Sequence, residues 1–134
     1  MRISKHIDSS EITCKCGCGF DNLDVKAIVL FERLRAAASK FNGFDTPIII
    51  NCACRCGKPT EKHPEYTDHN KAVGGVENSR HKVCDAFDLK TPKGLTNDEF
   101  HNLCDNVVNK FGGVGYYSWG CHVDTRGYHS RWGK

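Results

Sequence analysis

The sequence predicts a small α+β domain in which helices flank an antiparallel sheet. Two amphipathic helical patterns and several short β-rich runs predict this class, in the order helix, strand, long loop, strand, helix and strands. The chain has 134 residues, a length that suits one hydrophobic core and rarely two. We therefore expect residues 1–134 to form a single domain.

The first helix is expected over residues 21–41. Apolar side chains recur there at steps of three and four residues, with charged side chains between them. Asn42 and Gly43 follow, and a glycine at this point is typical of a helix C-terminus. The apolar positions are Val25, Ile28, Phe31, Leu34, Ala38 and Phe41.

Two β-rich segments are separated by a long polar loop. Residues 47–50 contain three isoleucines in a row and predict a buried strand. Residues 57–79 are polar and contain proline and glycine, and long irregular segments of this kind are often functional. Residues 84–89 alternate, so we expect Asp88 on one face of a strand and Phe87 on the other.

A second helix and a pair of strands complete the pattern. Thr96 and Glu99 form a capping box at the start of the helix. Gly112 and Gly113 end it, and residues 114–124 are aromatic and β-rich, which predicts a hairpin or adjacent strands. The expected buried stripe of this helix is Phe100, Leu103, Val107 and Phe111.

Charge and hydropathy restrict the class of partner. The formal net charge is +3, from 19 basic and 16 acidic residues that are dispersed along the chain, which disfavours nucleic acid as a partner. Residues 1–16 lack the apolar run of a signal peptide, and no stretch is long enough to cross a membrane. We expect synthesis in the cytoplasm.

Three residues have the side chains that a catalytic zinc site requires. His81 and Asp88 flank the start of one expected strand, and His122 lies on another. Two imidazoles and one carboxylate leave the fourth position of a tetrahedral zinc open for water. Strand alternation also places Asp124 on the same side as His122. Spacing alone does not single out these residues, because the chain has seven histidines.

The residues around these positions resemble a known family. The segment 79–88 is similar to the Ser-x-His-x-x-Gly-x-Ala-x-Asp signature of the zinc D-Ala-D-Ala peptidases, whose superfamily includes the hedgehog signalling domain. Four further segments resemble this family in the same order, and the resemblance extends from Cys14–Gly19 to Arg131–Trp132. These segments are His69–Gly75, Ile48–Asn51 with Arg55, Gly113–Tyr117 and His122–Arg126.

The resemblance implies a function and a set of site residues. His81, Asp88 and His122 would bind zinc, and Arg55 would polarise the scissile carbonyl and hold the oxyanion. It implies substrate contacts at Ser79 and Tyr117. The expected activity is hydrolysis of peptidoglycan stem peptides, as a D,D-carboxypeptidase or an endopeptidase.

The sequence departs from the family pattern at two positions. Cys84 replaces the signature glycine, so the turn after His81 must accept a side chain at a position that often needs positive φ. Trp119 stands where many relatives have an acidic general base. Asp124 would replace that base or would instead orient a ligand histidine. His69 and His129 are more remote candidates for the base.

The chain contains nine cysteines, and six of them form two Cys-x-Cys-x-Cys runs. This spacing differs from the Cys-x2-Cys pairs of zinc ribbons. Alternating cysteines on strands would face each other, so we expect Cys16 close to Cys54 and either a second metal or disulfides. The six cysteines are Cys14, Cys16, Cys18, Cys52, Cys54 and Cys56.

Three functions remain open at this point. The first is a monomeric zinc peptidase without nucleic-acid partners, which would act at the cell wall after release, as a phage endolysin does. The second is a non-catalytic zinc-containing binding module of the same fold, which the missing acid at Trp119 favours. The third is a cysteine–zinc nucleic-acid binder, which the modest charge disfavours.

Overall fold

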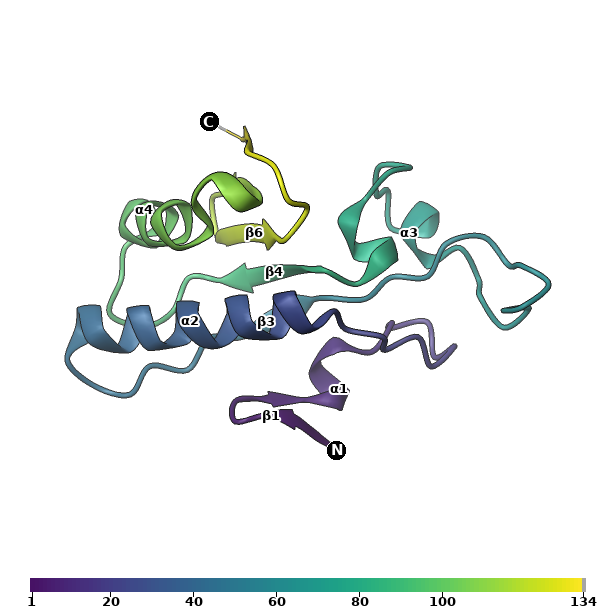
Figure 1. Ribbon diagram of the computed structural model, residues 1–134, viewed down its shortest axis with the longest axis horizontal. Helices are drawn as coiled ribbons and strands as arrows, with labels where there is room; N and C mark the ends of the chain where they lie inside the picture. Colours follow the sequence, from purple (N-terminus) through teal and green to yellow (C-terminus); the bar gives the residue numbers. More distant parts are fainter. Residues whose placement is uncertain (134) are drawn as a thin grey trace.

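A computed structural model describes residues 1–133 and confirms the α+β class. Its main sheet has five strands in the order β3-β4-β6-β5-β7, of which Figure 1 labels β3, β4 and β6. All its neighbouring strands are antiparallel except β5 and β7, which are parallel, so the sheet is mixed. These strands are β3 (Ile50–Cys52), β4 (Ala86–Lys90), β5 (Gly113–Tyr117), β6 (Gly120–Asp124) and β7 (Ser130–Trp132).

The remaining elements are a small ribbon and several helices. Strands β1 (Arg2–Ser4) and β2 (Ile7–Asp8) pair with each other at the N-terminus. The two long helices are α2 (Val25–Asn42) and α4 (Asn97–Val108). The short ones are α1 (Ser9–Ile12), α3 (His69–Ala72) and the 3₁₀ turns η1 (Arg80–Val83) and η2 (Asn109–Phe111).

Both long helices have the end signals that the sequence predicts, although their buried faces are shorter. Gly43 ends α2 in the left-handed conformation at φ 76°, and Thr96 caps α4 through a complete capping box. Val25 and Phe41 were expected to face the core but are exposed, because they lie at the two ends of α2. Phe111 is also exposed, because α4 ends before it.

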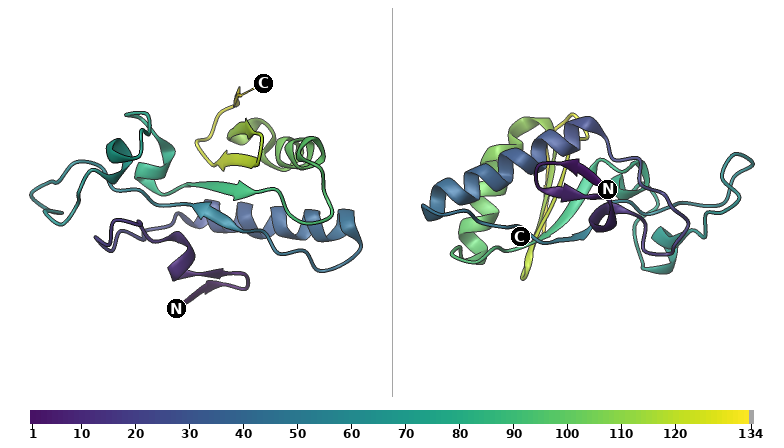
Figure 2. Two further views of the ribbon diagram at one scale, coloured as in Figure 1. Left: turned by 180° about the vertical axis from the view of Figure 1, so that it is seen from behind. Right: turned by 90° about the horizontal axis from the view of Figure 1, so that it is seen from below.

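Helices α2 and α4 cover one face of the sheet and form the core with it (Figures 1 and 2). Phe31 of α2 contacts Phe87 of β4 with 5.4 Å between the ring centroids. Leu89 and Val123 point to the same side and are fully buried. Burying such side chains contributes roughly 2 kcal/mol each, which fixes the helices on this face.

The alternate residues of the same strands point to the opposite face. In the register of β4 and β6, Asp88 pairs with His122 and Ala86 with Asp124. Since successive side chains of a strand point to opposite faces, the apolar positions that face the helices direct these polar ones to the other side. This open face carries the candidate site.

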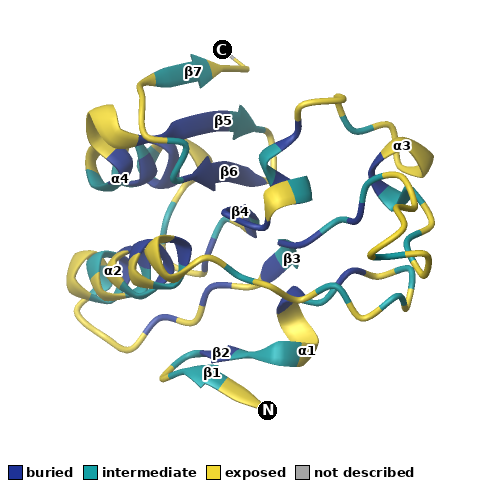
Figure 3. Cartoon of the chain, turned by 45° about the vertical axis from the view of Figure 1, so that its right-hand side comes forward, coloured by how far each residue is buried: buried dark blue, intermediate teal, exposed yellow. Residues whose placement is uncertain are grey.

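The loop of residues 57–79, with α3 within it, projects beyond the sheet and is largely exposed (Figure 3). The N-terminal segment packs beside β3, where the Cys54 N–H donates to the Ile12 carbonyl at 3.0 Å. Within residues 1–133, no helix has both the length and the apolar character that spanning a membrane requires.

Candidate metal centre

The turn before β4 brings His81 to the open face of the sheet. Ser79 caps η1, and its hydroxyl accepts the His81 N–H at 3.3 Å. The turn ends at Cys84, which has φ 54°, so this position adopts the left-handed conformation that favours glycine. Cys84 also forms a disulfide with Cys54. The chain therefore accepts a side chain at the glycine position of the family signature.

His81, Asp88 and His122 converge on one carboxylate oxygen. Asp88 Oδ1 lies 3.3 Å from His81 Nε2 and 3.2 Å from His122 Nδ1. The two imidazole rings are 5.0 Å apart and stand edge to face at 86°. Both histidines are buried, and they are held by different elements, η1 and β6.

The second nitrogen of each ring identifies which nitrogen is free to bind a metal. His81 Nδ1 lies 2.7 Å from the Ala53 carbonyl, and His122 Nε2 lies 2.8 Å from Asp124 Oδ2. Carbonyl and carboxylate oxygens only accept, so a neutral ring that donates to them through these nitrogens directs the lone pair of its other nitrogen toward Asp88.

That arrangement fits a divalent cation. His81 Nε2 is buried and makes no hydrogen bond within residues 1–133, although Asp88 lies beside it. Two lone pairs and a carboxylate oxygen at this spacing repel one another unless a positive charge lies among them. Burial alone would lower the pKa of His81 and of His122, but Asp88 outweighs it at His81, and Asp124 together with Asp88 outweighs it at His122, so both pKa values are raised.

Cys52 offers a fourth donor at this site, because it pairs with Asp88 in the register of β3 and β4. Its sulfur lies 3.8 Å from His81 Nδ1, and Cys52, His81 and Asp88 form a group with metal-ligand spacing. The Nδ1 atom already donates to the Ala53 carbonyl, whereas Nε2 is free. Nε2 is therefore the His81 nitrogen that is available to a metal, and the Cys52 sulfur lies within 4.8 Å of the donor atoms of His81 and Asp88.

Asp124 is fully buried and surrounded by donors. Its oxygens accept the Gly113 N–H at 2.9 Å, the Arg126 guanidinium at 2.7 Å and the His122 ring at 2.8 Å. Burial alone would raise the pKa of Asp124, but His122 and Arg126 hold this pKa well below its usual value. Asp124 does not line the cavity, and its contact with His122 is of the kind that orients a ligand histidine.

A cavity of about 970 Å³ opens in front of His81, Asp88 and His122. Arg55 lies in its wall and donates to the Ser79 hydroxyl at 3.0 Å, while its buried Nε atom has no hydrogen-bond partner within residues 1–133. Tyr117 also lines the cavity, and burial raises the pKa of Tyr117, so its hydroxyl stays protonated. The predicted residues Arg55, Ser79 and Tyr117 thus share one cavity with the candidate ligands.

Other predicted residues lie outside this wall. Trp119 stacks on Tyr117 with 4.9 Å between ring centroids, and neither it, His69 nor His129 lines the cavity. The wall instead contains residues that sequence reasoning did not single out as site residues. Among them are Glu77, Arg126, Tyr128 and Trp132.

The two cysteine runs meet, but not as two facing strands. The first run lies in a turn, and the cysteines of the second run have different partners. Cys52 contacts His81, Cys54 is bonded to Cys84, and Cys56 lies 3.8 Å from Cys16. The expectation that alternation aligns all three is wrong, because only Cys52 belongs to the regular strand β3.

Comparison with known proteins agrees with this geometry. Residues 5–124 match the family described as Peptidase M15, which is most of the chain. No curated protein and no solved structure matches the chain. Peptidases of this family are generally zinc-dependent, which agrees with the group of Cys52, His81 and Asp88 and with His122 beside Asp88. On this match, the chain belongs to the peptidase M15 family, the zinc D-Ala-D-Ala peptidases.

Proposed function

We propose that the protein is a zinc peptidase that hydrolyses peptidoglycan stem peptides, as a D,D-carboxypeptidase or an endopeptidase. His81, Asp88 and His122 would hold the metal. The observation that carries the proposal is the convergence of His81 Nε2 and His122 Nδ1 on Asp88 Oδ1 at 3.3 and 3.2 Å, in the wall of a large cavity. Family membership supports the same reaction class.

The metal would supply the nucleophile and the electrophile. Zinc bound by two imidazoles and a carboxylate lowers the pKa of a bound water to about 7 and polarises a substrate carbonyl. Hydrogen bonds from behind fix the orientation of the two ligand rings. The Ala53 carbonyl fixes the His81 ring, and Asp124 fixes the His122 ring.

Arg55 is the residue that would meet the charge that develops on the substrate carbonyl. Its guanidinium is held by Ser79, and no acidic side chain of residues 1–133 forms an ion pair with it. Arg80 and Arg126 also line the cavity, but Asp85 and Asp124 neutralise them. Arg55 is therefore the cavity arginine best placed to bind an oxyanion or a terminal carboxylate.

The proton acceptor would come from the cavity wall. Both oxygens of Asp124 are occupied by strong donors, which makes it a poor base. Asp88 and Glu77 are the acidic residues of the cavity wall within residues 1–133, and Asp88 is assigned to the metal. Glu77, in the exposed loop before η1, is the other acidic residue of this wall, and for that reason we propose it as the general base.

A non-catalytic zinc-containing binding module is the second candidate. By the family resemblance Trp119 stands where relatives have an acid, and Asp124 does not line the cavity. Such a module would bind stem peptides through Arg55 and Tyr117 without cutting them. The phage-endolysin role is a narrower form of the first proposal and is supported by the family resemblance.

Purified muropeptides distinguish these functions. The protein is incubated with them with and without a chelator, and the products are identified by mass spectrometry. Release of a terminal D-alanine supports the carboxypeptidase, and cleavage of a cross-link supports the endopeptidase; the chelator should abolish either. Binding without products, measured by calorimetry, supports the module. If the protein neither binds nor cleaves the muropeptides, both proposals are wrong.

A further inference from the structure

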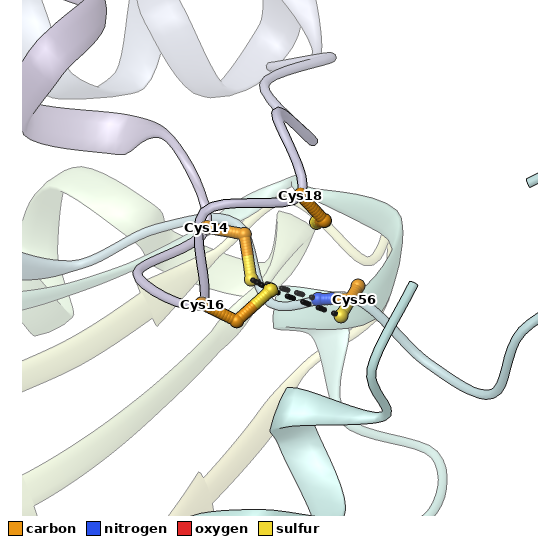
Figure 4. A group of neighbouring side chains, drawn as sticks. All are labelled: Cys14, Cys16, Cys18 and Cys56. Atoms are coloured by element: carbon orange, nitrogen blue, oxygen red, sulfur yellow. Dashed lines mark hydrogen bonds between the residues drawn. The ribbon is translucent and has the colours of Figure 1, made fainter. Parts of the chain in front are cut away.

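Four cysteine sulfurs gather where the turn after α1 meets the segment that follows β3. The sulfurs of Cys14, Cys16, Cys18 and Cys56 all lie within 4.8 Å of one another. Figure 4 shows Cys14, Cys16 and Cys56 pointing toward one another, with Cys18 beside them. Cys14 and Cys56 are buried, and the other two are partly exposed. Four soft donors at one point are a donor set of structural zinc sites.

The spacing of the sulfurs fits a single tetrahedral ion. Cys16 Sγ lies 3.5 Å from Cys14 Sγ and 3.8 Å from Cys56 Sγ. A zinc–sulfur bond is about 2.3 Å, so two sulfurs on one tetrahedral zinc lie about 3.8 Å apart. None of the four forms a disulfide, and all are free thiols, unlike Cys54 and Cys84. The spacing is that of ligands that share an ion.

Backbone N–H groups donate to two of these sulfurs. The Cys56 N–H donates to Cys14 Sγ at 3.4 Å. The N–H groups of Thr67 and His69 donate to Cys56 Sγ, each at 3.4 Å. Hydrogen bonds to a sulfur favour its thiolate form, and second contacts of this kind orient metal ligands.

The turn that carries the first three cysteines depends on two glycines. Gly17 and Gly19 have φ of 89° and 88°, and an added Cβ would meet no other atom at either position. Their role is thus conformational, because positive φ lets the chain curl back on itself. The Gly17 N–H donates to the Cys14 carbonyl at 3.2 Å and the Cys14 N–H to the Phe20 carbonyl at 2.9 Å, which closes the turn.

We propose that Cys14, Cys16, Cys18 and Cys56 bind a structural zinc ion that is separate from the candidate catalytic metal. The ion fastens the N-terminal turn to the strand exit that carries Arg55. It also fastens the long loop, because the His69 and Asn70 N–H groups donate to the sulfur and the carbonyl of Cys56. That loop continues into residues 73–78 of the cavity wall.

Metal counting on single-site variants tests this proposal. The chain is purified under reducing conditions, and its zinc, iron and copper are measured by mass spectrometry of the elements. We expect about two zinc ions per chain, one in His122→Ala and one in Cys16→Ser/Cys18→Ser. Cys104→Ala is the matched control, since Cys104 is buried in the core away from the cluster, and it should retain both.

Cobalt spectroscopy keeps the test independent of cysteine variants that fail to fold. Cobalt(II) added to metal-free His122→Ala should give strong sulfur-to-cobalt charge-transfer absorption with tetrahedral visible bands. Absence of this absorption, stoichiometric iron instead of zinc, or alkylation under denaturing conditions that finds the four cysteines paired would each overturn the proposal. A protein with the cysteine-bound zinc but no hydrolysis would instead overturn the proposed catalytic function alone.

Discussion

Asp88 of β4 lies directly opposite His122 of β6 in the antiparallel register, and its Oδ1 atom is 3.2 Å from His122 Nδ1. A direct cross-strand pair is the closest arrangement that two side chains of neighbouring strands can have. His81 then completes the group from the turn that precedes β4. Most of the candidate centre is therefore built from one strand pair and the turn that leads into it.

The ligand assignment predicts the effect of removing one imidazole. His122→Ala should remove the catalytic zinc and reduce hydrolysis to the level seen with a chelator, because two ligands hold zinc far more weakly than three. Zinc content and muropeptide cleavage are measured on the same preparation. His129→Ala is the control, since His129 does not line the cavity, and it should change neither quantity. Full zinc at this site in His122→Ala would show that the assignment is wrong.

The contacts of Asp124 predict a positioning role. Asp124→Asn should weaken zinc affinity by about ten- to a hundredfold, because the amide orients the His122 ring less well. The affinity is measured by competition with a chelator of known strength. The folded state should also be less stable, since Arg126 loses its buried partner.

Glu77→Gln is the matched comparison for Asp124→Asn. If Glu77 is the general base, its variant should keep its zinc and lose roughly a hundredfold or more in turnover. If instead Asp124→Asn loses turnover but keeps its zinc affinity, and Glu77→Gln keeps its turnover, Asp124 is the base.

The contacts of Arg55 predict a loss of turnover without a loss of metal. Arg55→Lys should lower kcat by roughly a hundredfold or more, because lysine cannot reproduce the fixed fork of the guanidinium. Arg33→Lys on the exposed side of α2 should behave as the wild type. An unchanged kcat with a raised KM would place Arg55 in substrate binding alone.

Trp132 of β7 packs closely against Gly115 of β5, which predicts that Gly115 tolerates no side chain. A Cβ there would lie 2.5 Å from the Trp132 ring, which itself lies 5.0 Å from the His122 ring. Gly115→Ala should lower the free energy of unfolding by about 1–3 kcal/mol and reduce activity. Thermal unfolding measures the first effect. Gly57→Ala is the control, because its Cβ would meet only the flexible end of Lys82.

The contacts of Glu32 with the N-terminal segment predict that the free energy of unfolding depends on pH. Burial alone would raise the pKa of Glu32, but hydrogen bonds from Ser4 and His6 outweigh it and lower this pKa. A lowered folded-state pKa adds stability above the unfolded value of about 4.3, and this stability is lost as the pH falls.

Glu32→Gln tests the direction of this effect. Its free energy of unfolding should lie roughly 1.5 kcal/mol below that of the wild type at pH 7. The difference between the two proteins should narrow as the pH falls below about 4, as measured by urea unfolding. A constant difference across this range would show that Glu32 acts through packing and not through its charge.

Periodicity and end signals were enough to predict the main elements. The hairpin of β5 and β6, the two long helices and the alternation of β4 all follow from local patterns. Strand β7 was not predicted, because its three residues have no such pattern. Its pairing is parallel and joins it to β5, which is distant in the sequence. Helix α1 was also missed, since a single turn has no measurable period.

The site was predictable where side-chain chemistry is distinctive and unpredictable where contacts are distant. Histidine and carboxylate types, with the family resemblance, identified the group that the sheet brings together. Sequence could not separate a base from an orienting carboxylate at Asp124, because the difference lies in its contacts with Gly113 and Arg126. The sequence did not indicate that Glu77 lines the cavity, because its loop has no periodicity that places its side chain.

The pairing of Asp88 with His122 also makes the centre a sensor of strand alignment. A slip of β4 by one residue would replace Asp88 with Phe87 or Leu89 on the open face and turn the carboxylate toward the helices. No partly aligned sheet could then hold zinc through all three ligands. A metal bound there would therefore stabilise the correct strand register relative to the misaligned ones, and so would contribute to folding as well as to catalysis.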